Sequence, residues 1–409
     1  MSRAFCFVLV GLAACGGDDG DADWEAATPL FDPAHVLAID VQMAPGDWDA
    51  LRAQTRTFED LFDRPDCTAS PWPSPFTYFP ASVTIDGVLV EDVAIRKKGF
   101  IGSLSDTKPS LKIGFDVTDP EARFSGLEKM TLNNSIQDAA YVNQCVAYQV
   151  FERAGIPASR CNFATVSVNG QPLGVYVHVE SIESELVAHH FGGNDGNLYE
   201  GTLSDFTDDW YGTLDKKNNQ AADDWSDVDA LLAAAQAPDD QLLAQLASVI
   251  DLDEFFTFWA VEALVQHWDG YAGNINNYWL YQDGGRLHFL PWGVDQVLAE
   301  RNPVQGDDAP SSVYATGVLA WRLYRHPEGR ALYDAAMRRV LDAAWDEAAL
   351  DAEIDRMAAL IAPHLGGQDL SGELAARHAF VGSRRAIVLT ELDGGPPEWP
   401  YELRASFCQ

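Results

Sequence analysis

The stretch from His267 to Asp295 reads HWDGYAGNINNYWLYQDGGRLHFLPWGVD and sets the expectations for the fold. Two runs rich in aromatic and aliphatic residues, 277–281 and 286–290, flank the dipeptide Gly284-Gly285, which is typical of a β-hairpin. Asp269 lies in a polar loop before this hairpin, and Asp295 follows its second strand. Because a hairpin reverses the chain, the spacing predicts that Asp269 and Asp295 meet in one cleft.

The order His267, Asp269, Asn274 and then a strand-end Asp295 resembles the catalytic loop and the metal-binding aspartate of protein-kinase-like phosphotransferases. In those enzymes the first aspartate orients or deprotonates the attacking hydroxyl, and the Asn and the second Asp hold Mg²⁺. The alternative interpretation is that all three are capping and turn residues around a hairpin.

The pattern elsewhere predicts an α+β protein with two lobes. Two more hairpins are expected around Asp86-Gly87 and Asn169-Gly170, with a helix over 138–154 between them. Helical periodicity then dominates the second half of the chain. The predicted segments are hairpins over 82–96 and 164–179, a loop over 205–219, helices over 227–236, 239–250 and 252–266, and a mainly helical region over 311–392. We therefore expect a mixed N-terminal lobe over about 31–200, a helical C-terminal lobe over about 223–392, and a tail over 393–409.

The charge of the chain excludes one class of partner and points to one strand region. Asp and Glu number 62 against 27 Lys and Arg, so the net charge of -35 repels nucleic acid, and no nucleic-acid partner is expected. Five of the seven lysines fall between Lys97 and Lys129. A lysine of the 98–112 region is therefore a candidate contact for phosphate oxygens. The alternative is a solvated strand edge, on which lysines oppose aggregation.

The N-terminus resembles a bacterial lipoprotein signal. Arg3 precedes an apolar stretch, and Leu12-Ala13-Ala14-Cys15 is a small-residue cleavage site that ends in Cys. This predicts a signal peptide over 1–14, lipidation of Cys15 and an acidic tether over 15–30 with nothing to bury. The alternative is an ordinary secretory peptide. The membrane would then be contacted through the lipid anchor alone, and the protein is expected to be an exported lipoprotein of the bacterial cell envelope.

Export also predicts disulfides. Cys67, Cys145, Cys161 and Cys408 are an even number in an oxidising setting, so two bonds are expected. Four cysteines allow three pairings. We favour Cys145 with Cys161, which flank one helix-to-strand unit, and Cys67 with Cys408.

From about Ala38 to about Leu392 the chain also resembles the CotH kinase-like proteins, a family named for a spore coat protein. The matching blocks include Ile95–Gly99, Lys108–Ile113, Ala147–Pro157, Val168–Val177 with Glu180, Asn197–Tyr199, Asp269 with Asn276-Asn277-Tyr278, and Phe289–Trp292 with Asp295. The resemblance implies an atypical, exported protein-kinase fold without the usual glycine-rich loop. It implies ATP with Mg²⁺ or Mn²⁺ as cofactors, and Ser or Thr of extracytoplasmic proteins as the acceptor.

Carried over by residue, the resemblance makes Asp269 the catalytic aspartate and Asp295 a metal ligand, and Asn274 fits the metal-binding position by spacing. Lys98 belongs to the candidate basic strand, and either Lys108 or Lys112 matches the position that contacts phosphate. Glu180 matches a family position; it pairs either with that lysine or with another cation at the strand end.

Two departures from the family pattern keep a second function open. The first Asp of the family's Pro-Trp-Asp-x-Asp motif is Gly293 here, and the Asn-Leu-Tyr-Lys block ends in Glu200. Asp283 and Glu300 are candidate substitutes for the missing carboxylate. Besides the kinase, the sequence allows a catalytically silent surface protein that serves adhesion or envelope assembly, a transferase of nucleotidyl groups, and a two-carboxylate glycosidase using Asp269 and Asp295.

Overall fold

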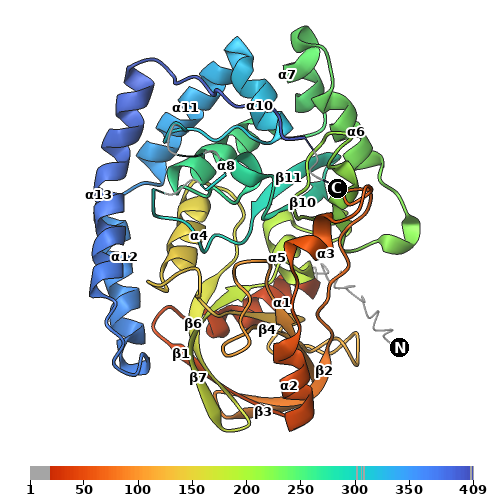
Figure 1. The fold of residues 1–409 in the computed structure, drawn as a ribbon, viewed down its shortest axis with the longest axis vertical. Helices are drawn as coiled ribbons and strands as arrows, with labels where there is room; N and C mark the ends of the chain where they lie inside the picture. The colour runs from red at the N-terminus through yellow and green to blue at the C-terminus, as the bar shows by residue number, and fades with distance from the viewer. Residues whose placement is uncertain (1–18, 301–302, 305, 307–308, 406–407, 409) are drawn as a thin grey trace, which may run out of the picture.

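The computed structural model describes residues 19–300, 303–304, 306, 309–405 and 408, and Figure 1 shows a strand-rich part with a helical part above it. Seven of the described strands form a closed sheet in the order β1-β2-β3-β4-β5-β7-β6. β1 and β6 close it as a parallel pair, and the neighbours along the rest of the sheet are antiparallel. The strands are β1 (Val36–Met43), β2 (Phe79–Ile85), β3 (Val88–Lys98), β4 (Ser110–Gly114), β5 (Lys129–Asn133), β6 (Cys161–Val168) and β7 (Gln171–Glu180).

The closed sheet forms because its strands alternate apolar and polar residues. In β1, Leu37, Ile39 and Val41 are buried, and the residues between them are more exposed. These side chains and those of the other strands fill the interior, where Tyr176 donates a hydrogen bond to the carbonyl of Pro109 at 3.0 Å. The two predicted hairpins of this lobe are confirmed, with turns at Asp86-Gly87 and Asn169-Gly170.

A second, smaller sheet carries the hairpin quoted at the outset. Its order is β11-β10-β8-β9, with antiparallel neighbours throughout. Its strands are β8 (Leu198–Gly201), β9 (Asp215–Lys216), β10 (Tyr278–Asp283) and β11 (Arg286–Pro291). The pairing of Tyr278 with Pro291 confirms the predicted hairpin and brings the residues before β10 close to those after β11.

The C-terminal lobe is helical, as predicted, and α8 lies at its centre, where nine of its residues are buried. The helix predicted over 138–154 begins later, at Asn143, because the buried carboxylate of Asp138 accepts the backbone N–H groups of Asn143 and Ala140. Figure 1 shows α4 between the closed sheet and the upper helices. The helices are α4 (Asn143–Arg153), α5 (Ser184–Phe191), α6 (Ser226–Ala235), α7 (Asp239–Ala247), α8 (Leu252–Leu264), α9 (Tyr271–Asn274), α10 (Val318–Arg325), α11 (Pro327–Ala343), α12 (Glu347–Ile361) and α13 (Ser371–Asp393).

The segment between β1 and β2 contains α2 (Pro45–Ala53) and α3 (Phe58–Phe62). We call residues 54–78 the cover loop. Lys97 of β3 holds the start of this loop, because its ammonium donates to the carbonyls of Arg52 and Gln54 at 2.7 Å each. The loop then carries a capping box between Thr57 and Asp60 at the start of α3.

The expectation of an acidic tether over 15–30 is wrong for its described part. Residues Asp19–Ala27 form α1, and Thr28–Phe31 form a 3₁₀ turn. Trp24 stacks on His189 with ring centroids 3.5 Å apart, and the guanidinium of Arg160 lies 4.0 Å from the Trp24 ring. Trp24 thus gives the segment an aromatic surface to bury, although the segment is acidic in composition.

The predicted signal peptide over 1–14 and Cys15 lie outside the described residues. In the part of the chain that the structure describes, the helices are too short or too polar for any of them to span a membrane.

Candidate functional site

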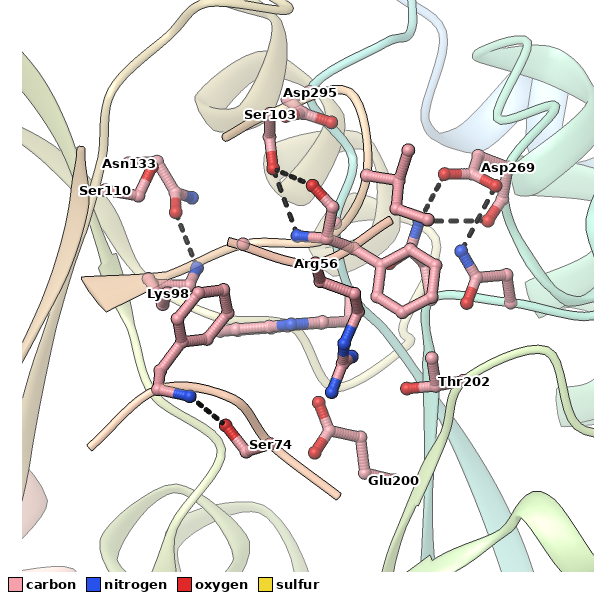
Figure 2. Close-up of a pocket in the computed structure, with 18 of the residues that line it drawn as sticks. Arg56, Ser74, Lys98, Ser103, Ser110, Asn133, Glu200, Thr202, Asp269 and Asp295 are labelled. Atoms are coloured by element: carbon pink, nitrogen blue, oxygen red, sulfur yellow. Dashed lines mark hydrogen bonds between the residues drawn. The ribbon is translucent and has the colours of Figure 1, made fainter. Parts of the chain in front are cut away.

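A cavity of about 280 Å³ lies where the closed sheet, the smaller sheet and α4 meet the cover loop (Figure 2). Both predicted aspartates line it, as does Lys98 at the end of β3. Gln144 and Tyr148 of α4, Glu200 and Thr202 around the end of β8, and Arg56 and Trp72 of the cover loop complete much of its wall. The cavity therefore joins residues that are more than 200 positions apart in the sequence.

The loop that presents Asp269 is fixed from below by a buried carboxyl group. Glu262 of α8 accepts the backbone N–H groups of Tyr271 and Ala272 at 2.8 and 2.9 Å. Glycine is required beside it, since a Cβ atom on Gly270 would lie 2.1 Å from Oε1 of Glu262. Burial raises the pKa of Glu262 to about 8. Glu262 was not predicted as a site residue, because in the sequence it is one more polar residue of an amphipathic helix.

Three amide side chains hold the carboxylate of Asp269. Its Oδ1 accepts from Asn274 at 2.6 Å and from Asn276 at 3.2 Å, and its Oδ2 accepts from Asn277 at 2.8 Å. Burial raises the pKa of Asp269, and these hydrogen bonds oppose that rise because they stabilise the charged form. The carboxylate is consequently held in one orientation at the cavity wall (Figure 2).

The structure does not bring Asn274 to the cavity. Its amide is used on both sides, because Nδ2 donates to Asp269 and Oδ1 accepts from Nη1 of Arg404. Asn277 lines the cavity instead, and within the described residues no hydrogen bond to its Oδ1 is found. Asn277 is therefore better placed than Asn274 to offer an oxygen to a metal ion. The sequence signal for it was the Asn276-Asn277-Tyr278 block of the family resemblance.

Asn277 also explains the glycine at position 293. Gly293 has a φ of +58°, and a Cβ atom there would lie 2.5 Å from Cγ and Oδ1 of Asn277. The space that a side chain at position 293 would enter is thus filled by the Asn277 amide. The two candidate substitutes, Asp283 and Glu300, do not line the cavity.

Asp295 follows β11 and faces the same cavity (Figure 2). Asn143 of α4 donates to its backbone carbonyl at 2.8 Å, which fixes the loop against the helix. Burial and the negative charge of Asp269 raise the pKa of Asp295 to about 6, and Lys98 opposes the rise. The two carboxylates repel each other in one cavity, and a bound cation would reduce this repulsion.

Of the three predicted lysines, Lys98 lines the cavity and Lys108 and Lys112 do not. The ammonium of Lys98 donates to Oδ1 of Asn133 at 2.6 Å and lies 5.4 Å from the ring of Trp292. Burial, with a further contribution from Lys112, lowers the pKa of Lys98 to about 7, against the attraction of Asp295. Lys98 is thus a partly buried amine whose charged form is favoured by the carboxylates of Asp295 and Glu200.

The other lysines hold parts of the fold together. Lys108 donates to the carbonyl of Val175 at 2.7 Å, and burial lowers its pKa to about 8. Lys112 and Lys129 both pair with Glu183 at 2.9 Å. Burial alone would raise the pKa of Glu183, but the two ammonium groups outweigh burial and lower it to about 2. Glu183 was not identified from the sequence.

Glu180 pairs with a cation other than the predicted lysines. Its carboxylate accepts the Arg160 backbone N–H at 3.0 Å and is bound by the Arg160 guanidinium at 2.5 Å. The second of the two sequence alternatives, an ion pair with another cation at the strand end, is therefore the one observed. Glu180 does not line the cavity.

The second residue that departs from the family pattern forms an ion pair at the cavity wall. Glu200 contacts the ammonium of Lys217 at 2.7 Å, and Lys217 also contacts Asp215 at 2.9 Å. All three residues line the cavity, together with Arg56 and Arg96. Burial alone would raise the pKa of Glu200, but Lys217 lowers it, so the carboxylate is charged. Glu200 had been noted only as a departure from the family pattern, and none of these residues was predicted as a site residue.

Both predicted disulfides are present. Cys67 bonds to Cys408 and Cys145 to Cys161, with Cα atoms 5.4 and 5.1 Å apart. Among the described residues, no group of three or more His, Cys, Asp or Glu side chains converges as a metal site. Any metal held here would depend on Asp269, Asp295 and amide or ligand oxygens. Such oxygens suit a hard cation such as Mg²⁺ or Mn²⁺.

Known proteins resemble this chain over much of its length. Inner spore coat protein H of Bacillus subtilis strain 168 is 22% identical over 256 residues, which cover 59% of this chain and 69% of that protein. Invasin CotH2 of Rhizopus delemar is 24% identical over 231 residues, which cover 50% of this chain and 39% of the invasin. This chain thus aligns with less than half of the fungal relative.

One solved structure, a proinflammatory kinase CtkA of Helicobacter pylori, matches with 10% identity and a TM-score of 0.37, covering 72% of this chain and 94% of that one. The family model described as CotH kinase protein matches residues 95–385, which is well over half of the chain. The matched range contains Lys98, Asp269 and Asp295, and the chain belongs to the CotH kinase protein family.

Proposed function

We propose that this protein is a metal-dependent phosphotransferase, an atypical Ser/Thr protein kinase that uses ATP with Mg²⁺ or Mn²⁺. The observation that supports it most is the meeting of Asp269, Asp295 and Lys98 in one cavity. Carboxylates and a cation in such a cavity match what phosphoryl transfer needs, which is positioning of the two reactants and neutralisation of phosphate charge.

Each of the three side chains then has its own part in the reaction. Lys98 contacts phosphate oxygens, which supply the counter-charge that a partly buried ammonium favours. Asp269, held by three amides, accepts a hydrogen bond from the acceptor hydroxyl and orients it toward the phosphorus. Asp295, which lines the same cavity, would serve as a metal ligand.

The metal would be held by Asp295 together with the Oδ1 atom of Asn277. These are oxygen ligands, which Mg²⁺ and Mn²⁺ prefer. When bound, a divalent cation would supply positive charge that offsets the negative charge of the phosphate. Burial, together with the negative charge of Asp269, raises the pKa of Asp295 to about 6, and the repulsion between the two carboxylates favours the binding of such a cation.

We further propose that the protein works outside the cytoplasm, as an exported lipoprotein of the bacterial cell envelope attached through Cys15. The two disulfides support an oxidising compartment. The names of the relatives, a spore coat protein and an invasin, agree with a surface location. The acceptor would be Ser or Thr of an extracytoplasmic protein.

Gly293 favours a second candidate, a catalytically silent surface protein that keeps the kinase-like scaffold for adhesion or envelope assembly. The position lacks a carboxylate, and the neighbouring space is filled by Asn277. A scaffold that has lost one metal ligand binds nucleotide weakly, so nucleotide binding separates the two candidates.

The deciding experiment is a thermal-shift titration with ATP, with and without Mg²⁺ or Mn²⁺, on the wild type and on Asp295→Asn. Ligand that binds the native state stabilises it by about 2.7 kcal/mol at a concentration 100 times its Kd. We expect a metal-dependent shift that Asp295→Asn abolishes. Asp283→Asn is the matched control, since Asp283 lies on the same hairpin but outside the cavity, and it should retain the full shift.

The absence of any shift at millimolar ATP would overturn the phosphotransferase and support the silent surface protein. If the shift is found, incubation with ATP labelled at the γ or the α phosphate identifies the group transferred. Label from the γ position on a protein acceptor supports the kinase. Label from the α position alone would contradict it and indicate nucleotidyl transfer.

A further inference from the structure

The tail that follows α13 returns to the loop that carries Asp269. In the described residues it comprises 394–405 and Cys408, and side chains of the helical lobe fix it along its path. The Tyr324 hydroxyl donates to the carbonyl of Pro397 at 2.6 Å, and the Trp321 indole donates to that of Tyr401 at 3.0 Å. The Trp210 indole then donates to the carbonyl of Arg404 at 3.0 Å. These bonds bring Arg404 to the loop that carries Asp269.

Arg404 controls the orientation of an amide that touches Asp269. Its Nη1 donates to Oδ1 of Asn274 and lies 3.4 Å from the Asn274 carbonyl oxygen. The Nδ2 atom of the same amide donates to Asp269 at 2.6 Å. A guanidinium has donors and no acceptor, so it binds the oxygen end of the amide and leaves the nitrogen end for Asp269. Without Arg404, rotation of the Asn274 amide by half a turn would place its oxygen against the carboxylate.

The same loop is strained at the next residue. Ile275 has a φ of +51°, which is rare for a β-branched side chain and persists only where the surroundings hold it. Ile275 is fully buried in a small apolar cluster with Leu61, Phe62 and Cys67 of the cover loop, and Cys408 of the tail packs against that cluster. Residues of both the cover loop and the tail thus pack near Ile275 and keep the Asp269 loop in place.

The Cys67–Cys408 disulfide joins these two segments, which are 341 positions apart in the sequence. Cys67 is a fully buried residue of the cover loop, whose Arg56 and Trp72 line the cavity. Breaking this bond would remove the covalent link between the cover loop and the end of the tail. The oxidation state of this disulfide therefore decides whether the tail that carries Arg404 is covalently linked to the cover loop.

We propose that Arg404 is a positioning residue of the site, delivered by the tail and held there by the Cys67–Cys408 disulfide, so that full transfer activity requires that bond. The proposal rests on the proposed phosphotransferase function. It concerns the orientation of Asp269 toward the acceptor, while nucleotide and metal are bound by Lys98, Asp295 and Asn277. Loss of Arg404 should consequently slow the transfer step and leave nucleotide affinity largely unchanged.

The first test compares Arg404→Ala with wild type in kcat and KM for ATP. A group that orients a catalytic side chain is typically worth about 10–100-fold in activity. We expect a fall in kcat of about this size, little change in KM for ATP, and partial recovery on adding guanidinium ion. Arg325→Ala is the matched control, because Arg325 is exposed, its contacts with Tyr401 and Glu402 of the tail are long, at 3.4 and 3.8 Å, and the Trp321 indole still holds the Tyr401 carbonyl without it. It should behave as wild type.

The second test separates the two disulfides. The double variant Cys67→Ser, Cys408→Ser should lose kcat as Arg404→Ala does, when assayed well below its melting temperature. The double variant Cys145→Ser, Cys161→Ser removes the bond between α4 and β6 and should keep wild-type kcat at the same distance below its own melting temperature. Equal loss in both double variants would contradict a specific role for the bond to the tail.

A third readout does not depend on activity. Hydrogen–deuterium exchange of the backbone amides of residues 270–277 should accelerate in Arg404→Ala and in the Cys67→Ser, Cys408→Ser variant, and stay unchanged in the Arg325→Ala control. If the wild type transfers no phosphate, the proposed function fails and this exchange still tests the contact. Unchanged exchange and unchanged kcat in Arg404→Ala would overturn the positioning role.

Discussion

Lys98 shows how one residue of a basic stretch differs from its neighbours. Lys97, Lys108, Lys112 and Lys129 each bind a carbonyl or a carboxylate of the fold, and their charges are used there. Lys98 has the neutral Asn133 oxygen as its hydrogen-bond partner and faces the cavity. Burial, reinforced by the charge of Lys112, accounts for its pKa of about 7, well below the ordinary lysine value. Its ammonium therefore has the most to gain from a bound phosphate.

This pKa predicts that nucleotide binding takes up a proton at pH 8. Free Lys98 is mostly neutral at pH 8, because its pKa is about 7, and phosphate oxygens beside it favour the charged form and raise that pKa. Calorimetric titration with ATP in buffers of different ionisation enthalpy measures the uptake. Asp295, with a pKa of about 6, is already ionised at pH 8 and does not contribute to proton uptake.

Lys98→Arg provides the control for this titration, because an arginine is charged in both the free and the bound protein. It should show binding without the uptake. The same uptake in wild type and in Lys98→Arg would assign the proton to another group, and no uptake in wild type would mean that the phosphate does not reach Lys98.

Among the elements, α1 differs most from its prediction, because a packed helix is found where an acidic tether was expected. Its residues are acidic, yet Trp24 lies between the ring of His189 and the guanidinium of Arg160, which also donates to the Trp24 carbonyl at 2.9 Å. Arg160 is in turn bound by the buried Glu180. The helix is thus attached to the junction of β6, β7 and α5, and the family position Glu180 serves this junction.

We predict that Trp24→Ala lowers the free energy of unfolding by about 2 kcal/mol, since it removes a stacked ring and a cation–π contact. Urea unfolding at pH 7 measures the change. Glu25→Ala, at an exposed position of the same helix, should stay within about 0.5 kcal/mol of wild type. A Trp24→Ala variant as stable as Glu25→Ala would mean that residues 19–27 behave as a tether after all.

The whole molecule carries a net charge of -35, and this charge acts on its stability. Like charges on a compact surface repel one another, and salt screens that repulsion, with a Debye length of about 30 Å at 0.01 M and about 3 Å at 1 M. The ion pairs that line or surround the cavity are partly buried and are screened less.

We therefore predict that the melting temperature rises with ionic strength between 10 mM and 0.5 M salt. Differential scanning calorimetry in NaCl and in KCl measures the rise, which should be the same in both salts if screening is its cause. A rise confined to one salt would indicate a bound ion instead, and a fall would mean that ion pairs outweigh the net repulsion.

Local patterns in the sequence were enough to predict the three hairpins, the helices of the second half, both disulfides and the convergence of Asp269 with Asp295. Apart from the Cys67–Cys408 bond, which was predicted as the pairing left once Cys145 was matched with Cys161, each of these depends on neighbours in the chain, on a periodicity or on a turn dipeptide, and so needs no knowledge of distant contacts. Local patterns could not decide between candidate site residues of the same type. Lys98 rather than Lys108 or Lys112, and Asn277 rather than Asn274, line the cavity because of where strands and loops far apart in sequence come to lie.

The closed sheet, the cover loop and the return of the tail also depend on such distant contacts. β1 closes the sheet against β6, more than 100 residues later, and Arg404 reaches Asn274 across 130 positions. A pairing of this kind is stabilised by burial and hydrogen bonds that exist only in the folded chain. The residues next to each partner in the sequence do not indicate the other partner. Periodicity therefore determined the elements of this protein, and long-range packing determined which of its charged and amide side chains share one cavity.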